Sequence, residues 1–139
     1  MGVLGLILSG VLLGSMLLFV AIVAPTVFKV LEPEPAGGFL RALFPRLYVW
    51  ITAVAAVTSV VLLFSTVLGA LLMFGVAVGA AYSNWILTPQ INAARDAWKA
   101  GGKDFAKANF DRLHNLSTRI YGVQLIGVGL VLILAGLAV

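Results

Sequence analysis

The sequence predicts an all-α integral membrane protein in which four transmembrane helices form one antiparallel bundle. Hydrophobic residues make up 62% of the 139 residues and charged residues only 10%, with a mean hydropathy of +1.12. A soluble domain carries roughly 25% charged residues, so too few are present here to cover the apolar surface in water, and lipid is the expected solvent. Long uncharged stretches alternate with two charged connections. At this length we expect a single transmembrane domain over residues 1–139.

The first expected span covers residues 3–27. No charge occurs between Gly2 and Phe28, and a helix needs about 20 apolar residues to cross a bilayer. Because no basic residue precedes Lys29 and the apolar run exceeds the apolar region of a signal peptide, we expect this segment to stay in the membrane. Pro25 is expected to bend or end the helix near the interface.

The connection to the second span is predicted to contain a short interfacial helix. The sequence Glu-Pro-Glu-Pro at residues 32–35 predicts a turn. Pro45 is expected to kink the junction with the second span, and Tyr48 and Trp50 are expected to lie in the aromatic belt. The interfacial helix is predicted from apolar side chains at helical spacing between charged ones: Phe39, Leu40, Leu43, Phe44 and Leu47.

Residues 47–94 carry no charge and are too long for one span. As a single helix they would measure about 70 Å, more than twice the ~30 Å thickness of a hydrocarbon core. We therefore expect two spans, at residues 46–65 and 68–90, joined by a tight turn around residues 65–69.

The last part of the chain is predicted to form one more span. The helix of the third span should run past Pro89 and end at the glycines of positions 101 and 102, because a glycine after the last turn is a common helix terminator. Asp104 is expected to cap the next helix, whose span covers residues 117–138.

The charge distribution predicts the orientation. All nine Lys and Arg lie in residues 29–46 and 95–119, and these two connections share one side of a four-span bundle. The positive-inside rule places that side in the cytoplasm. We therefore expect a multi-pass protein of the cell (inner) membrane with both the N- and C-termini outside.

Two stripes of polar side chains predict a pocket between the helices of the third and fourth spans. At 100° per residue, each stripe falls on one face of its helix. Polar groups in lipid face the bundle interior or a wet cavity, so we expect the stripes to face each other or a common pocket open to the cytoplasm. The alternative is that they only hydrogen-bond neighbouring helices, at about 0.6 kcal/mol each. The residues are Asn84, Thr88, Asn92 and Arg95, and then His114, Ser117, Tyr121 and Gln124.

His114 is the only histidine, and the chain has no cysteine. It is interpreted as an interfacial structural residue, a proton or ligand contact, or a haem or copper ligand. A metal site needs three or four ligands, so we expect no resident metal or cofactor, with His114 as the one candidate ligand. No nucleophile–base set and no phosphate-binding loop is recognisable, which disfavours an enzyme.

The positions of glycines and lysines indicate two kinds of partner, a second copy of the chain and membrane lipids. Gly10 with Gly14 and Gly75 with Gly79 have the spacing that lets helices approach closely in lipid, which favours a homo-oligomer. The net charge of +4 is assigned to membrane lipids rather than nucleic acid, because no soluble basic domain is present. The row formed by Lys99, Lys103 and Lys107 is either a solvated surface or a contact for anionic lipid.

Four short motifs occur in order along the chain and cover nearly all of it: Phe28-x-x-Leu31, Leu43-Phe44-Pro45-x-x-Tyr48, Asn84-x-x-x-x-Pro89 and Phe110-x-x-x-His114-x-Leu116-Ser117. With them the chain resembles the transmembrane protein 205-like family, also described as a bacterial domain of unknown function of the 4149 type. The resemblance implies a four-span membrane protein without an established reaction. The animal member's link to platinum-drug resistance and trafficking hints at transport. Tyr121 stands where an asparagine is expected in this family.

Three functions are compatible with these observations. The first is a non-enzymatic small transporter, channel or export helper whose transported species is unknown. The second is a haem- or copper-binding membrane protein, because the chain has a distant likeness to the copper-resistance protein D group. The third is a structural or lipid-interacting membrane protein.

Overall fold

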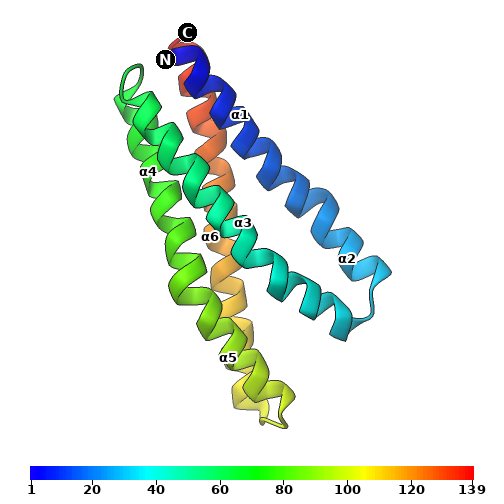
Figure 1. Cartoon of the computed structure of the whole chain (residues 1–139). Coiled ribbons are helices and arrows are strands. Elements are labelled where there is room, and N and C mark those ends of the chain that lie inside the picture. The colour runs from blue at the N-terminus through cyan, green and yellow to red at the C-terminus, as the bar shows by residue number, and fades with distance from the viewer.

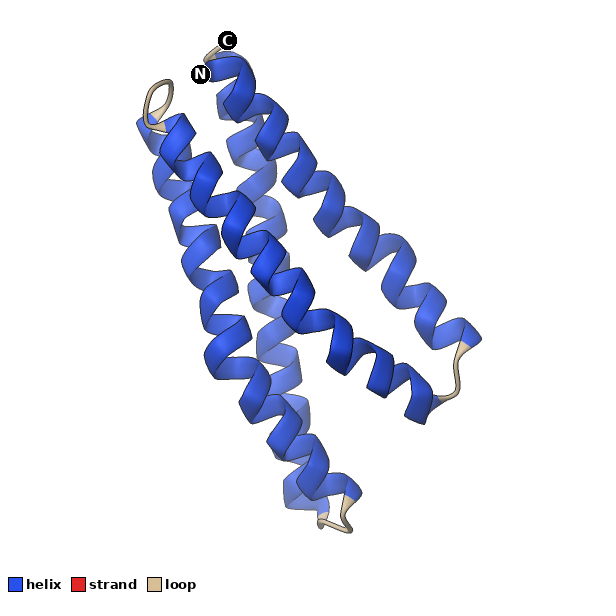
Figure 2. Cartoon of the chain, in the orientation of Figure 1, coloured by secondary structure: helices blue, strands red, loops and turns tan.

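The computed structural model describes residues 1–139 and contains four long helical segments and no strand. Figure 1 shows the four segments running antiparallel, and Figure 2 shows that only short loops join them. The predicted all-α architecture with four helices able to span a membrane is confirmed. The segments are α1 (Gly2–Leu18), η1 (Phe19–Val23) and α2 (Ala24–Val30); α3 (Pro33–Leu62); α4 (Val67–Tyr82), η2 (Ser83–Leu87) and α5 (Thr88–Lys99); and α6 (Asp104–Leu137).

The outer surface of the bundle is apolar. Large aliphatic and aromatic side chains stand exposed on every segment, whereas soluble monomers rarely expose contiguous apolar patches of this extent. Lipid is the solvent that such a surface requires, and the protein is a multi-pass membrane protein. Exposed examples are Ile7, Val11, Val57, Val60, Leu71, Phe74, Val123, Ile126 and Ile133.

The core lies along the shared axis of the bundle. α1 and α4 each pack against both α3 and α6. On α1, the residues that face this core are Gly5, Ser9, Leu12 and Met16. The main core cluster also contains the fully buried side chains of Ile51, Leu62, Met73, Val128 and Val131.

Two helices pass through a proline by means of a π-helical turn. Pro25 lies two residues after the end of η1, and Pro89 lies two residues after the end of η2. Proline has no N–H and its ring collides with the preceding turn, so a wider turn lets the helix continue. Thr88 Oγ1 also donates to the Ser83 carbonyl at 2.6 Å. Pro25 therefore does not end the first helix, which continues to Val30.

The predicted interfacial helix does not form a separate helix. Residues 33–47 instead form the first part of α3, which runs unbroken to Leu62. A proline is tolerated in the first turn of a helix because the N–H groups there have no helical partner, so the Glu-Pro-Glu-Pro sequence starts α3 instead of preventing a helix. Pro45 lies inside α3. Beside it, Arg46 Nη1 donates to the Ala42 carbonyl at 2.7 Å.

Two of the other predicted helix boundaries agree with the structure, and one predicted cap does not. The predicted tight turn falls at residues 63–66, and Thr66 caps α4 by accepting a hydrogen bond from the Gly69 N–H at 3.3 Å. α5 ends as predicted before Gly101, whose φ of 91° is left-handed. The predicted cap at Asp104 is wrong, because Lys103 holds the cap position and Asp104 is the first residue of α6.

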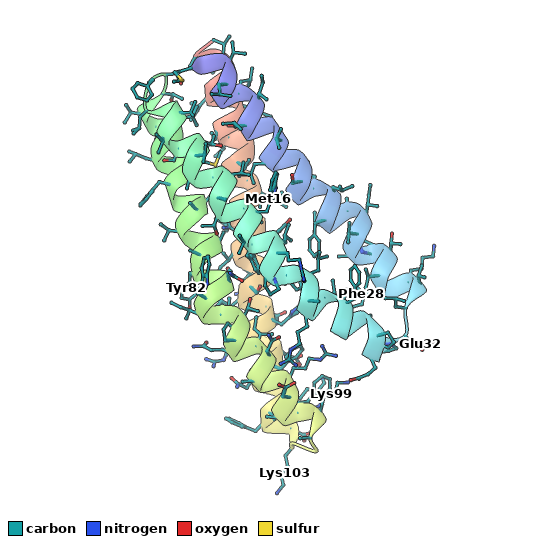
Figure 3. All side chains as sticks on the ribbon, in the orientation of Figure 1. Met16, Phe28, Glu32, Tyr82, Lys99 and Lys103 are labelled. Atoms are coloured by element: carbon teal, nitrogen blue, oxygen red, sulfur yellow. The ribbon has the colours of Figure 1, made fainter.

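The two ends of the bundle differ. Figure 1 shows both termini and the α3–α4 turn at one end, and both charged connections at the other. At the charged end the helices diverge into an α2–α3 pair and an α5–α6 pair. Figure 3 places Glu32, Lys99 and Lys103 at this end. The prediction that the charged connections share one side is confirmed.

Gly5 is expected to be essential for packing at the closed end. A Cβ added at Gly5 would lie 2.5 Å from Cδ2 of Leu62, whose side chain is fully buried. Gly5→Val should therefore destabilise the bundle by about 1–3 kcal/mol, the usual cost of overpacking. The measurement is unfolding in mixed detergent, with Gly129→Val as the control because nothing lies within 4 Å of an added Cβ there. Equal stability of the two variants would contradict the packing.

Candidate functional site

A cavity of about 300 Å³ lies where the helices diverge. Its walls come from η1 and α2, from α3 and from α6, so it is bounded by three of the four helical segments. Most of the lining is apolar, and the polar groups come chiefly from α6. The lining residues are Phe19, Val20, Ala24, Phe28, Leu40, Phe44, Tyr48, His114, Ser117, Thr118, Tyr121, Gly122 and Leu125.

A second cavity, of about 50 Å³, lies between α3, α5 and α6. It is the more polar of the two and contains four of the residues that the sequence predicts to share a pocket: Thr88, Asn92, His114 and Ser117. The remaining lining residues are Arg41, Phe44, Tyr48 and Ile91. The structure thus brings Thr88 and Asn92 of one stripe together with His114 and Ser117 of the other, without Arg95.

The two cavities share one wall, formed by Phe44, Tyr48, His114 and Ser117. Tyr48 is only 2% exposed, and its hydroxyl forms a 3.1 Å hydrogen bond with Ser117 Oγ. The rings of Phe44 and Tyr48 stack with centroids 5.8 Å apart. The shared wall thus consists of side chains from α3 and α6.

Tyr48 was not among the expected pocket residues, and its predicted place in the aromatic belt is wrong. Tyr48 is buried within the bundle, where its side chain reaches from α3 to Ser117 on α6. The sequence signal was present in the Leu43-Phe44-Pro45-x-x-Tyr48 motif, which carried the family resemblance but was not connected with the pocket.

Tyr121 and Gln124 each form a hydrogen bond from α6 to another helix. The Tyr121 hydroxyl donates to the Met16 carbonyl on α1 at 2.8 Å, and Gln124 Nε2 donates to the Val76 carbonyl on α4 at 2.9 Å. Tyr121 also lines the larger cavity, whereas Gln124 and Asn84 line neither. For Gln124 the structure supports the simpler alternative, a polar residue that hydrogen-bonds a neighbouring helix in lipid.

His114 is exposed and stacks on Phe110, with ring centroids 5.8 Å apart and planes 10° apart. No group of three or more His, Cys, Asp or Glu side chains is placed to hold a metal ion. His114 therefore belongs to no such group.

Charged side chains tie α3 to α5 at the open end. The Arg41 guanidinium holds the Asp96 carboxylate with two hydrogen bonds, of 2.7 and 3.0 Å. Lys99 Nζ lies 3.7 Å from Glu34 Oε2. The Arg95 guanidinium packs directly on Gly37, where any added Cβ would collide with it. Arg95 therefore points toward α3 and lines neither cavity.

The three lysines of the predicted row lie in different environments. Lys99 and Lys107 lie over the Trp98 ring, with Nζ 4.9 and 5.8 Å from its centroid. Lys107 Nζ also lies 3.4 Å from Asp111 Oδ2. Lys103 extends away from the bundle at its tip (Figure 3). The row is thus not one uniform basic face.

Tyr121→Phe should lower the stability of the bundle by about 0.6 kcal/mol, and by no more than ~1.7 kcal/mol, because it removes one interhelical hydrogen bond in lipid. Tyr82→Phe on α4 is the matched control, since no hydrogen bond of the Tyr82 hydroxyl is found. Unfolding in mixed detergent measures both. An effect of Tyr82→Phe as large as that of Tyr121→Phe would contradict the assignment.

Comparison with known proteins gives a family and no activity. No curated protein and no solved structure matches the chain. A family described as a domain of unknown function (DUF4149) matches residues 7–100, about two thirds of the chain. The match contains the α1–α2, α3 and α4–α5 walls of the two cavities, while α6 lies beyond it. The chain is therefore a multi-pass membrane protein that belongs to the DUF4149 family.

Proposed function

We propose that this protein is a non-enzymatic carrier or export helper that binds a small, largely apolar molecule within the membrane. One observation carries the proposal: a cavity of about 300 Å³ with apolar walls and a few polar groups on one side. Sites for small molecules have this character, with volumes of roughly 300–1,000 Å³ and a small number of polar groups that fix orientation.

The ligand would enter the larger cavity from the bilayer, between α2 and α6. α2 packs beside α3 and has no extensive contact with α6, so this side of the bundle is only loosely closed. Two lining residues on this side, Val20 and Phe28, are 42% and 65% exposed. An apolar molecule dissolved in lipid can reach the cavity along such a path without crossing water.

Self-association is part of the proposal, because four helices enclose too little volume for a pathway through one chain. Two of the four predicted packing glycines support it. Gly14 and Gly75 are exposed, and no atom of the chain lies within 4 Å of an added Cβ at either position. Gly10 and Gly79 instead face Leu132 and Gln124 of their own chain. A second copy would pack on the faces of Gly14 or Gly75.

The proposal further assigns the chain to the transmembrane protein 205-like group, on the strength of the four ordered motifs. It places the charged end in the cytoplasm, because all nine Lys and Arg gather there. Lys99 and Lys107 are each paired with an acidic side chain, whereas no ion pair is found for Lys103, whose charge is then available to anionic headgroups.

Filling the cavity should weaken binding. Gly122 lines the cavity and has no atom within 4 Å of an added Cβ, so the side chain of Gly122→Leu begins in open space. We expect photolabelling by a long-chain alcohol with a photoreactive diazirine to fall about tenfold, which corresponds to about 1.4 kcal/mol. Mass spectrometry of the labelled peptides is the measurement.

Gly129→Leu is the control for this experiment, because Gly129 lies on the same helix, outside the cavity, and has equal space. It should label like the unmodified protein, with the label on the cavity walls. Labelling spread evenly over the exposed faces, or unchanged in Gly122→Leu, would reject the binding site.

The orientation is tested with reporter fusions. A reporter inserted after Ser65 or fused after Val139 should be active only outside the cell, whereas one inserted at Gly101 should be active only inside. A cytoplasmic signal from either of the first two positions would overturn the assignment of the charged end to the cytoplasm.

A further inference from the structure

We propose that the smaller cavity is the head-group subsite of the same binding site, so that the natural ligand is a single-chain amphiphile with an anionic head. Its hydrocarbon tail occupies the larger cavity and its head lies beside Arg41. The inference rests on the proposed function and adds to it the chemical class of the ligand.

The two cavities are adjacent. Phe44, Tyr48, His114 and Ser117 line both, so a single layer of side chains separates them. One 3.1 Å hydrogen bond, between Tyr48 and Ser117, is the polar contact found across this layer. Rotation of the Phe44 and Tyr48 side chains would join the two spaces into one elongated site, apolar at one end and polar at the other.

The polar end offers hydrogen-bond donors. Arg41 uses Nη1 and Nη2 to hold Asp96, but a guanidinium carries five N–H groups, so some remain for another acceptor. The amide of Asn92 and the hydroxyl of Ser117 line the same space. A carboxylate or phosphate only accepts hydrogen bonds, and bonds from a guanidinium to such an anion are among the strongest in proteins.

The local charge favours an anion over a cation. Arg41 holds the carboxylate of Asp96, and Arg95 is close enough to act on the same carboxylate through its charge. All the charged residues of the chain lie at this end, with nine basic and five acidic side chains, so the field there is positive. A cationic head group would meet repulsion from both arginines.

The size of the small cavity limits the head group. Its volume is about 50 Å³, which is room for only a few water molecules. A group of a few heavy atoms fits, and a carboxylate is the closest match. A sugar head group does not fit there. The larger cavity, at about 300 Å³, is at the low end of the size range of small-molecule sites, which is why the ligand is assigned a single chain.

The experiment compares photoreactive probes that share one alkyl chain but differ in the head group, on the protein in nanodiscs of uncharged lipid. The probes are a fatty acid in its ionised form, the corresponding alcohol and the corresponding alkyl phosphate. We expect the acid to label the cavity walls about tenfold more efficiently than the alcohol.

The double variant Arg41→Gln/Asp96→Asn should remove this preference and keep labelling by the alcohol. It removes the arginine without leaving an unpaired carboxylate, and the net charge of the chain is unchanged. Lys107→Gln/Asp111→Asn is the matched control, because it removes another ion pair from the charged end outside both cavities. It should retain the preference for the acid.

Asp96→Asn alone should increase labelling by the acid, because it removes the carboxylate that competes for Arg41. A merely structural role of the ion pair predicts the opposite change.

Equal labelling by acid and alcohol in the unmodified protein would overturn the anionic subsite while leaving the apolar site intact. Absence of cavity labelling by every probe would instead reject the proposed function itself. Stronger labelling by the phosphate than by the acid supports an anionic subsite and identifies a phosphate head group; weaker labelling supports it and identifies a carboxylate.

Discussion

The structure depends on the requirement that every backbone polar group in a lipid-exposed segment has its partner inside the protein. Helices meet this requirement within one segment, and the chain keeps its helices intact even where prolines interrupt the hydrogen-bond ladder. Pro25 and Pro89 are preceded by π-helical turns, and Pro33 stands at a helix start. The four segments therefore stay continuous from one end of the bundle to the other.

Side-chain size then determines where the bundle is closed and where it opens. Near the termini Gly5 and Ser9 are buried, and α1 lies close to α3 and α6. Toward the charged end four aromatic rings take the place of small residues. Phe19 meets Phe44 and Tyr121 with centroids 5.3 and 6.0 Å apart, and Tyr48 stacks on Phe44. These rings are too bulky for close helix approach, and the larger cavity lies among them.

Polar side chains complete the structure in two different ways. Ser59, Tyr121 and Gln124 each donate to a backbone carbonyl of another helix and have a structural explanation. Arg41 and Asn92, by contrast, line a cavity at the charged end, where water or a ligand can compete for them. The candidate function follows from the second group, because each residue of the first group already donates a hydrogen bond to a neighbouring helix.

The sequence by itself determined the solvent, the number of spans, the turn near Ser65, the end of α5 at Gly101 and the segregation of charge to one end. These properties are local, since they depend on stretch length, residue type and the single left-handed glycine. Only the tertiary structure decided that Tyr48 faces Ser117 and that Arg41 pairs with Asp96. It also decided that Gln124 donates to the Val76 carbonyl instead of lining the pocket. Helical periodicity places residues on a common face of their own helix, but the rotation of each helix against its neighbours depends on side-chain packing throughout the bundle.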